Sequence, residues 1–173
     1  MFNPAITLGA VFGRILQPRY FVPYLFFQIL GGLVAGFTLR EGFLSLSAGT
    51  GLGSTKLAAE INPVLGIAIE ASGTFVLTFS ALFASDRIKK GTYQALLVGL
   101  TLFFLILLIG PLTGAGFNPA RSLGPSVASG YFEHLYVYFV GPFLGASVAG
   151  LIFREIGNAR SKREKRFDIV CLR

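Results

Sequence analysis

Four long runs of apolar residues constrain this chain more than any other feature of its sequence. Each is close to the length of about 20 residues that a helix needs to cross the hydrocarbon core of a bilayer. Glu70 is the only Asp, Glu, Lys, Arg or His inside any of them. The third run is slightly short, and we expect Thr92 or Pro111 to bound it. The runs are Tyr20–Leu39, Val64–Ser85, Tyr93–Ile109 and Leu135–Phe153.

The composition agrees with a membrane protein. Charged residues make up 13% of the chain, whereas a typical soluble domain has about 25%. The net charge of +7 comes from basic residues at the ends of the apolar runs and in the C-terminal tail, with no basic, aromatic-rich soluble module. We therefore expect no nucleic-acid partner. The chain has one cysteine, Cys171, and one histidine, which is too few for a metal site, and we expect no cofactor. No nucleophile–base pair is visible, so we do not expect an enzyme.

Two further apolar stretches are too short to span a bilayer. They are Asn3–Phe12 and Asn118–Ala128, and both begin with Asn-Pro-Ala. Asn is a favoured N-cap, and Pro fits the first helical position because its missing N–H is not needed there. Short helices beside full-length spans suggest re-entrant segments, which a membrane tolerates where they line a cavity or are buried in protein.

The distribution of Lys and Arg predicts the orientation. All but three of these residues fall on one side of the membrane, which the positive-inside rule assigns to the cytoplasm together with the C-terminal tail. Residues 156–173 then form a basic cytoplasmic tail, and residues 40–63 form an outer loop. The two short helices would enter the membrane from opposite faces.

The two short stretches are copies of one another. Asn3-Pro4-Ala5-Ile6-Thr7-Leu8-Gly9 and Asn118-Pro119-Ala120-Arg121-Ser122-Leu123-Gly124 agree at five of seven positions. Matching elements of opposite orientation indicate an inverted repeat, whose functional site usually lies near the bilayer midplane.

Paired Asn-Pro-Ala half-helices, the second followed by Arg121, resemble the major intrinsic protein family of aquaporins and glyceroporins. The resemblance covers residues 1–155 and implies an all-α, aquaporin-like inverted-repeat bundle, here with four spanning helices and two re-entrant half-helices. Members of the family have six spans, and a Gly-x-His usually precedes the first motif; here only Met1 and Phe2 precede it. We expect an N-terminally truncated chain. A genuine four-span channel is the alternative.

Physical chemistry suggests how such a pore would work. Two half-helices meeting end to end direct about half a positive charge each, with unpaired N–H groups, at the midplane. Amides of Asn3 and Asn118 would add donors, so that a water molecule there would turn its hydrogens toward both exits and interrupt a proton wire. The alternative is that each Asn caps only its own helix.

The second copy carries further candidate residues. Arg121 is a cation within the membrane, where burying a charge costs free energy, so a functional role is the first expectation. The resemblance makes it the arginine of the outer constriction. The alternative is a structural Arg tied to carbonyls. Counted back from Arg121 without gaps, two other filter positions of the family fall on Ala115 and Ile106, although Ile106 also fits plain helix packing. Neither is His, so the constriction would be wider and more apolar than in strict water channels. Small residues before the cap would present pore-lining carbonyls, namely those of Gly114, Gly116 and Phe117.

Other residues would support the loops or the packing. The resemblance makes Glu70 an acceptor for the backbone of a re-entrant loop, and a transporter's proton relay is the alternative. Gln28 is interpreted in the same way, as a polar bridge to the loops. Glycines spaced four apart suggest close helix packing; they are Gly32, Gly36, Gly141 and Gly145.

These features predict a passive channel for water and other small neutral solutes in a lipid bilayer. The resemblance implies the homotetramer that is usual in the family. Ser122 after the motif arginine and Tyr138-Phe139 in the last span favour an aquaporin over a glyceroporin. The alternatives are a glycerol facilitator, a fragment that does not conduct alone, and a secondary transporter, for which only Glu70 offers a coupling-ion ligand.

Overall fold

The structure, a computed structural model, describes the backbone of residues 1–47 and 51–171 and the side chains of residues 1–42 and 51–160. This part of the chain is helical and contains no strand. Two 3₁₀ turns lie at Pro18–Tyr20 and Gly51–Gly53. The helices are α1 (Pro4–Phe12), α2 (Phe21–Ser47), α3 (Pro63–Arg87), α4 (Gly91–Thr113), α5 (Pro119–Ser129) and α6 (Val137–Cys171).

Four of the described helices, α2, α3, α4 and α6, are long and apolar enough to cross a membrane. With the two short helices α1 and α5, they confirm the predicted fold class. Both expected boundaries of α4 are wrong. The helix begins at Gly91 and so contains Thr92, and it continues past Pro111 to Thr113, after which Gly114, with a left-handed φ of 75°, forms the C-cap. A proline so near the end removes a single ladder hydrogen bond, which leaves the helix able to continue.

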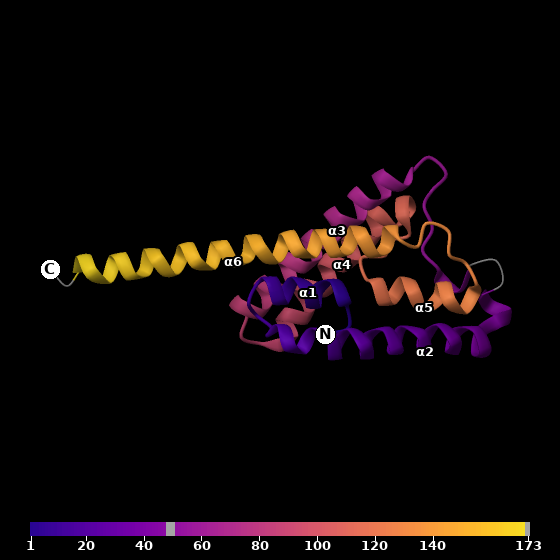
Figure 1. The fold of residues 1–173 in the computed structure, drawn as a ribbon, viewed down its shortest axis with the longest axis horizontal. Helices are drawn as coiled ribbons and strands as arrows, with labels where there is room; N and C mark the ends of the chain where they lie inside the picture. Colours follow the sequence, from indigo (N-terminus) through magenta and orange to yellow (C-terminus); the bar gives the residue numbers. More distant parts are fainter. Residues whose placement is uncertain (48–50, 172–173) are drawn as a thin grey trace.

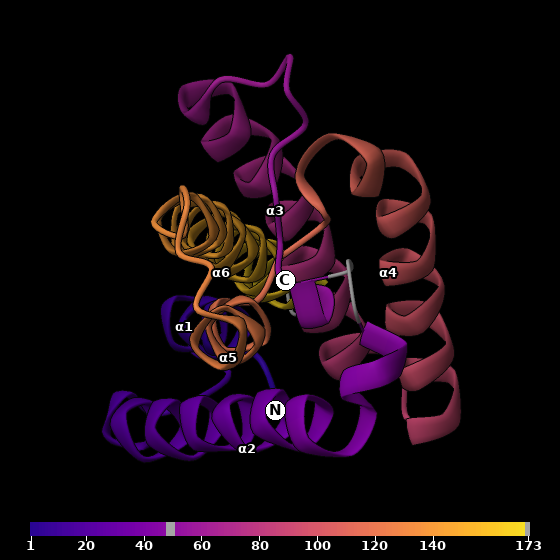
Figure 2. The same ribbon diagram turned by 90° about the vertical axis from the view of Figure 1, so that its right-hand side faces the viewer.

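The two short helices lie in line between α2 on one side and the group of α3, α4 and α6 on the other (Figure 1). On one side α3 packs along α6, and α4 packs on α3; on the other side α2 runs past both short helices. Viewed along this line, α1 and α5 overlap while α4 stands well away from them (Figure 2). The bundle therefore places two helix N-termini against each other in its middle.

Glycines allow the closest helix contacts. A side chain at Gly36 would collide with the backbone of Gly124, where α2 crosses α5, and one at Gly145 would collide with the backbone of Ala71, where α6 crosses α3. The predicted role of these spaced glycines in close packing is confirmed. One correction concerns their partners, since Gly32 and Gly36 contact a half-helix rather than another span.

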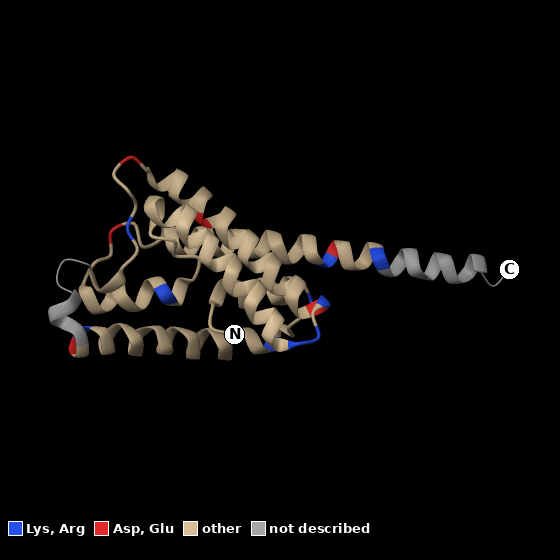
Figure 3. Ribbon diagram, turned by 180° about the vertical axis from the view of Figure 1, so that it is seen from behind, with Lys and Arg blue, Asp and Glu red and all other residues tan. Residues whose placement is uncertain are grey.

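Charged residues gather toward the two ends of the bundle, and few lie between (Figure 3). The two that matter for the site are Glu70, completely buried in α3, and Arg121 in the first turn of α5. α2 continues beyond Arg40 to Ser47, so the expected outer loop is shorter than residues 40–63. Which end faces the cytoplasm stays a prediction.

Candidate functional site

Both Asn-Pro-Ala motifs fold into the same local structure. The Oδ1 of Asn3 accepts from the N–H groups of Ala5 at 2.9 Å and Ile6 at 3.4 Å. The Oδ1 of Asn118 accepts from those of Ala120 at 3.0 Å and Arg121 at 3.3 Å. A proline, Pro4 or Pro119, follows each cap at the first helical position. Local sequence thus forms each helix start.

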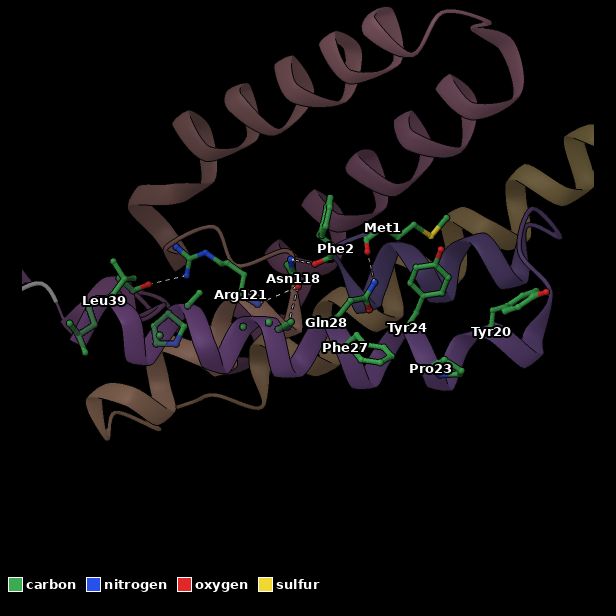
Figure 4. Close-up of a pocket in the computed structure, with 18 residues that line it drawn as sticks. Met1, Phe2, Tyr20, Pro23, Tyr24, Phe27, Gln28, Leu39, Asn118 and Arg121 are labelled. Atoms are coloured by element: carbon green, nitrogen blue, oxygen red, sulfur yellow. Dashed lines mark hydrogen bonds between the residues drawn. The ribbon is translucent and has the colours of Figure 1, made fainter. Parts of the chain in front are cut away.

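The remaining amide donors join the two halves. The Nδ2 of Asn3 donates to the carbonyl of Phe117 at 2.9 Å, and the Nδ2 of Asn118 donates to the carbonyl of Phe2 at 3.1 Å. Each cap therefore binds the residue that precedes the other cap, as Figure 4 shows for Asn118 and Phe2. The alternative that each Asn bonds only its own helix is wrong. Asn3 is only 8% exposed, whereas Asn118 is half-buried.

Glu70 holds the loop that precedes α5. Its Oε1 accepts from Thr113 Oγ1 at 2.6 Å and from the N–H of Gly116 at 2.9 Å, while Oε2 accepts from the N–H of Phe117 at 2.7 Å. Glu70 is completely buried. A buried carboxylate needs such donors to offset its loss of hydration, and the loop N–H groups, which have left helical geometry, need an acceptor.

Arg121 reaches from α5 to the turn at residues 51–53. Its Nη1 donates to the carbonyl of Gly53 at 3.0 Å. A guanidinium has five N–H donors, so others remain that this bond does not use. The side chain is exposed and lines a cavity of about 820 Å³ that runs along α2 (Figure 4). This cavity is lined largely by apolar groups of α2 and the N-terminal residues.

Only some of the predicted site residues line this cavity. Asn118, Ala120, Arg121 and Gln28 do. The others at the two motifs are buried and do not line it: Asn3, Pro4, Ala5, Ala115, Gly116, Phe117 and Pro119. Ile106, on α4, is 47% exposed and is not among the lining residues. The structure therefore groups Arg121 with the Asn-Pro-Ala ends but does not bring Ile106 to them.

Gln28 bridges α2 to the first half-helix. Its Nε2 donates to Thr7 Oγ1 at 2.8 Å and to the carbonyl of Met1 at 3.2 Å. Thr7 Oγ1 in turn donates to the carbonyl of Asn3 at 2.9 Å. Gln28 of α2 is thus connected to Asn3, the cap of α1, through the hydroxyl of Thr7.

Three residues of the site escaped sequence reasoning: Thr7, Thr113 and the carbonyl of Gly53. A threonine one residue before the glycine that ends α4 is a signal for Thr113, because its hydroxyl can bond a nearby backbone group. Gly53 lies in a loop rich in Gly, Ser and Thr that has no periodic pattern, so only the fold reveals its contact with Arg121.

Comparisons with known proteins agree with one another. The family profile described as "Major intrinsic protein" matches residues 1–153. "Aquaporin TIP2-1" of Arabidopsis thaliana is 35% identical over 157 residues, which are 89% of this chain and 61% of the relative. "Aquaporin-1" of Homo sapiens is 35% identical over 161 residues, 92% of this chain and 60% of the relative.

A solved structure supports the fold. The X-ray structure of the aquaglyceroporin from Plasmodium falciparum superposes with a TM-score of 0.80 at 23% identity, covering 90% of this chain and 72% of that chain. This chain spans about 60% of the length of the two aquaporins above.

Proposed function

Since the chain belongs to the major intrinsic protein family, we propose that it forms a passive membrane channel for water and other small neutral solutes. The observation that carries the proposal is the reciprocal pair of hydrogen bonds between the two caps, Asn3 to Phe117 and Asn118 to Phe2. These bonds hold two helix N-termini against each other in the middle of the bundle.

Two opposed N-termini provide a barrier to charge. Each directs about half a positive charge toward the meeting point. The amide of Asn118 uses one N–H on Phe2 and keeps a second for a passing molecule. A water molecule that accepts this N–H turns its own hydrogens toward the two exits, which interrupts proton transfer along the file, while the positive field repels cations.

Arg121 would form the narrow outer constriction. Its bond to Gly53 fixes the guanidinium along the cavity and leaves donors for the oxygen of a solute. The dipole of α5 disfavours a cation in its first turn. Because Arg121 does not stabilise the helix there, its position favours a functional role over a structural one. The other two filter positions expected from the sequence, Ala115 and Ile106, are not His, but neither lines the cavity. We therefore assign the constriction in this chain to Arg121, and without a His beside it some neutral solutes besides water would fit.

Water is the proposed main solute. The resemblance to aquaporins at Ser122 and Tyr138-Phe139 favours it over glycerol. The carbonyls of Gly114, Gly116 and Phe117 are proposed as acceptors near the path, and Glu70 and Gln28 as the side chains that hold the two loops. A homotetramer and a cytoplasmic basic tail at residues 156–173 complete the proposal.

The test is osmotic shrinkage of proteoliposomes that contain the chain. Water efflux should exceed that of empty liposomes, with no increase in proton permeability. Arg121→Gln should raise proton or cation leak, whereas Arg87→Gln, at an arginine paired with Asp86 outside the cavity, should change neither. Efflux equal to that of empty liposomes would refute the proposal, and saturable, ion-coupled uptake would instead identify a secondary transporter.

A further inference from the structure

The loop between α4 and α5 has an unusual backbone. Three of its five residues, 114–118, have left-handed φ values: Gly114 at 75°, Ala115 at 48° and Phe117 at 50°. A residue with a Cβ disfavours this region because the Cβ approaches the following carbonyl. Ala115 and Phe117 therefore persist there only because the surroundings hold them.

Part of this restraint comes from Thr113, the last residue of α4. Its hydroxyl donates to Glu70 and also lies 3.3 Å from the N–H of Ala115, from which it accepts. The same carboxylate takes the N–H groups of Gly116 and Phe117. The loop is thus restrained at Ala115, Gly116 and Phe117 from the side of α3.

A second side chain that restrains the loop is Tyr138, in the first turn of α6. It is completely buried, and its hydroxyl donates to the carbonyl of Thr113 at 2.7 Å. That carbonyl belongs to the last turn of α4, where carbonyls lack partners within the helix. The ring packs on Gly116, where an added Cβ would lie 2.7 Å from its Cδ1 and 3.0 Å from Ser122 Oγ.

The loop leads directly into the cap and the arginine. Phe117 precedes Asn118, and Arg121 follows in the first turn of α5. A rotation at Ala115 or Phe117 would therefore change where Asn118 and Arg121 project. Because Gly116 is enclosed by Tyr138, Ser122 and Glu70, the position of the loop depends on the side chain of Tyr138.

We infer that Tyr138 is a positioning residue, whose hydroxyl, through the carbonyl of Thr113, fixes the strained loop 114–117 and with it the place of Arg121 and the solute selectivity of the channel. The inference rests on the proposed function for its selectivity part. Its structural part, that the hydroxyl protects the loop, holds or fails independently of conduction.

The test uses Tyr138→Phe, which removes one oxygen and keeps the ring. We expect the glycerol-to-water permeability ratio of proteoliposomes to rise about fivefold, the factor that corresponds to the loss of one ordinary hydrogen bond. In detergent, the backbone amides of Gly116 and Phe117 should exchange with deuterium about fivefold faster. Tyr136→Phe, at a side chain that is 54% exposed, is the matched control and should leave both values unchanged.

A second pair of variants guards against a general loss of folding. Thr113→Val removes the hydroxyl that bonds Glu70 and should also raise the glycerol-to-water permeability ratio. Thr113→Ser keeps the hydroxyl and should give the wild-type ratio.

Unchanged deuterium exchange at Gly116 and Phe117 in Tyr138→Phe would overturn the inference, even if the wild-type chain conducts. A faster exchange with an unchanged ratio in a conducting protein would overturn the selectivity part. A wild-type chain that does not conduct would refute the proposed function, and the exchange would still decide the role of the hydroxyl.

Discussion

The half-helices α1 and α5 have the same caps but different surroundings. Their Asn-Pro-Ala starts make the same hydrogen bonds, at nearly the same distances. Yet the residues before α5 are bonded by the carboxylate of Glu70, whereas the corresponding side of α1 is secured by the neutral amide of Gln28. The comparison teaches that a short motif determines how a half-helix begins. Side chains from distant parts of the chain determine where the N-terminal end of that half-helix lies in the bundle.

The largest expected effect tests this difference directly. Glu70→Ala would leave the buried N–H groups of Gly116 and Phe117 without acceptors, which should lower the free energy of unfolding by about 3 kcal/mol. Gln28→Ala, at the other half-helix, should cost about 1 kcal/mol because it removes neutral hydrogen bonds only. Denaturant unfolding in detergent measures both. Equal losses would contradict the asymmetry between the two halves.

A second expected effect concerns helix packing. An alanine at Gly124 of α5 would meet the backbone of Gly32, while one at Gly9 of α1 would meet chiefly the methyl group of Thr78 and a carbonyl of α6. A backbone yields less than a side chain, so Gly124→Ala should cost about 2 kcal/mol, and Gly9→Ala somewhat less. Gly31→Ala, where an added Cβ meets nothing, is the control. Thermal melting in detergent gives the order, and a larger loss at Gly9 would reverse the comparison.

The smallest expected effect separates the cap from the bond between the halves. Serine can still cap a helix but has no amide to donate across. Asn3→Ser should cost about 1 kcal/mol, since it leaves the buried carbonyl of Phe117 without its donor. Asn118→Ser should cost less, because Asn118 is more exposed than Asn3 and its partner Phe2 is 93% exposed. If the two variants melt at the same temperature, exposure does not determine the strength of these bonds.

Sequence alone predicted much of the fold, because hydropathy and capping are local. The predicted run Val64–Ser85 and the observed helix Pro63–Arg87 differ by only a few residues at each end. The expected boundary at Pro111 is wrong because a proline near a helix end can stay inside the helix. α2 continues past Arg40 because a charge does not by itself end a helix.

The site was less predictable than the fold. The caps follow from the motif, but the amides of Asn3 and Asn118 donate across the molecule, and no local pattern encodes that choice of partner. The contact of Arg121 with Gly53 depends on how an aperiodic loop returns to the bundle. Ile106 was placed by counting along the sequence, which does not determine where α4 lies relative to α5.

The bond from Asn3 to Phe117 joins residues 114 positions apart, and this has a consequence for biogenesis. While the ribosome is still making α3 and α4, the start of α1 has no partner for its amide. The first half-helix can therefore contact α2 early, but its bond to the second half-helix forms only after the second half-helix has been synthesised and inserted. Closure of the middle of the bundle is then a late event in the life of the nascent chain.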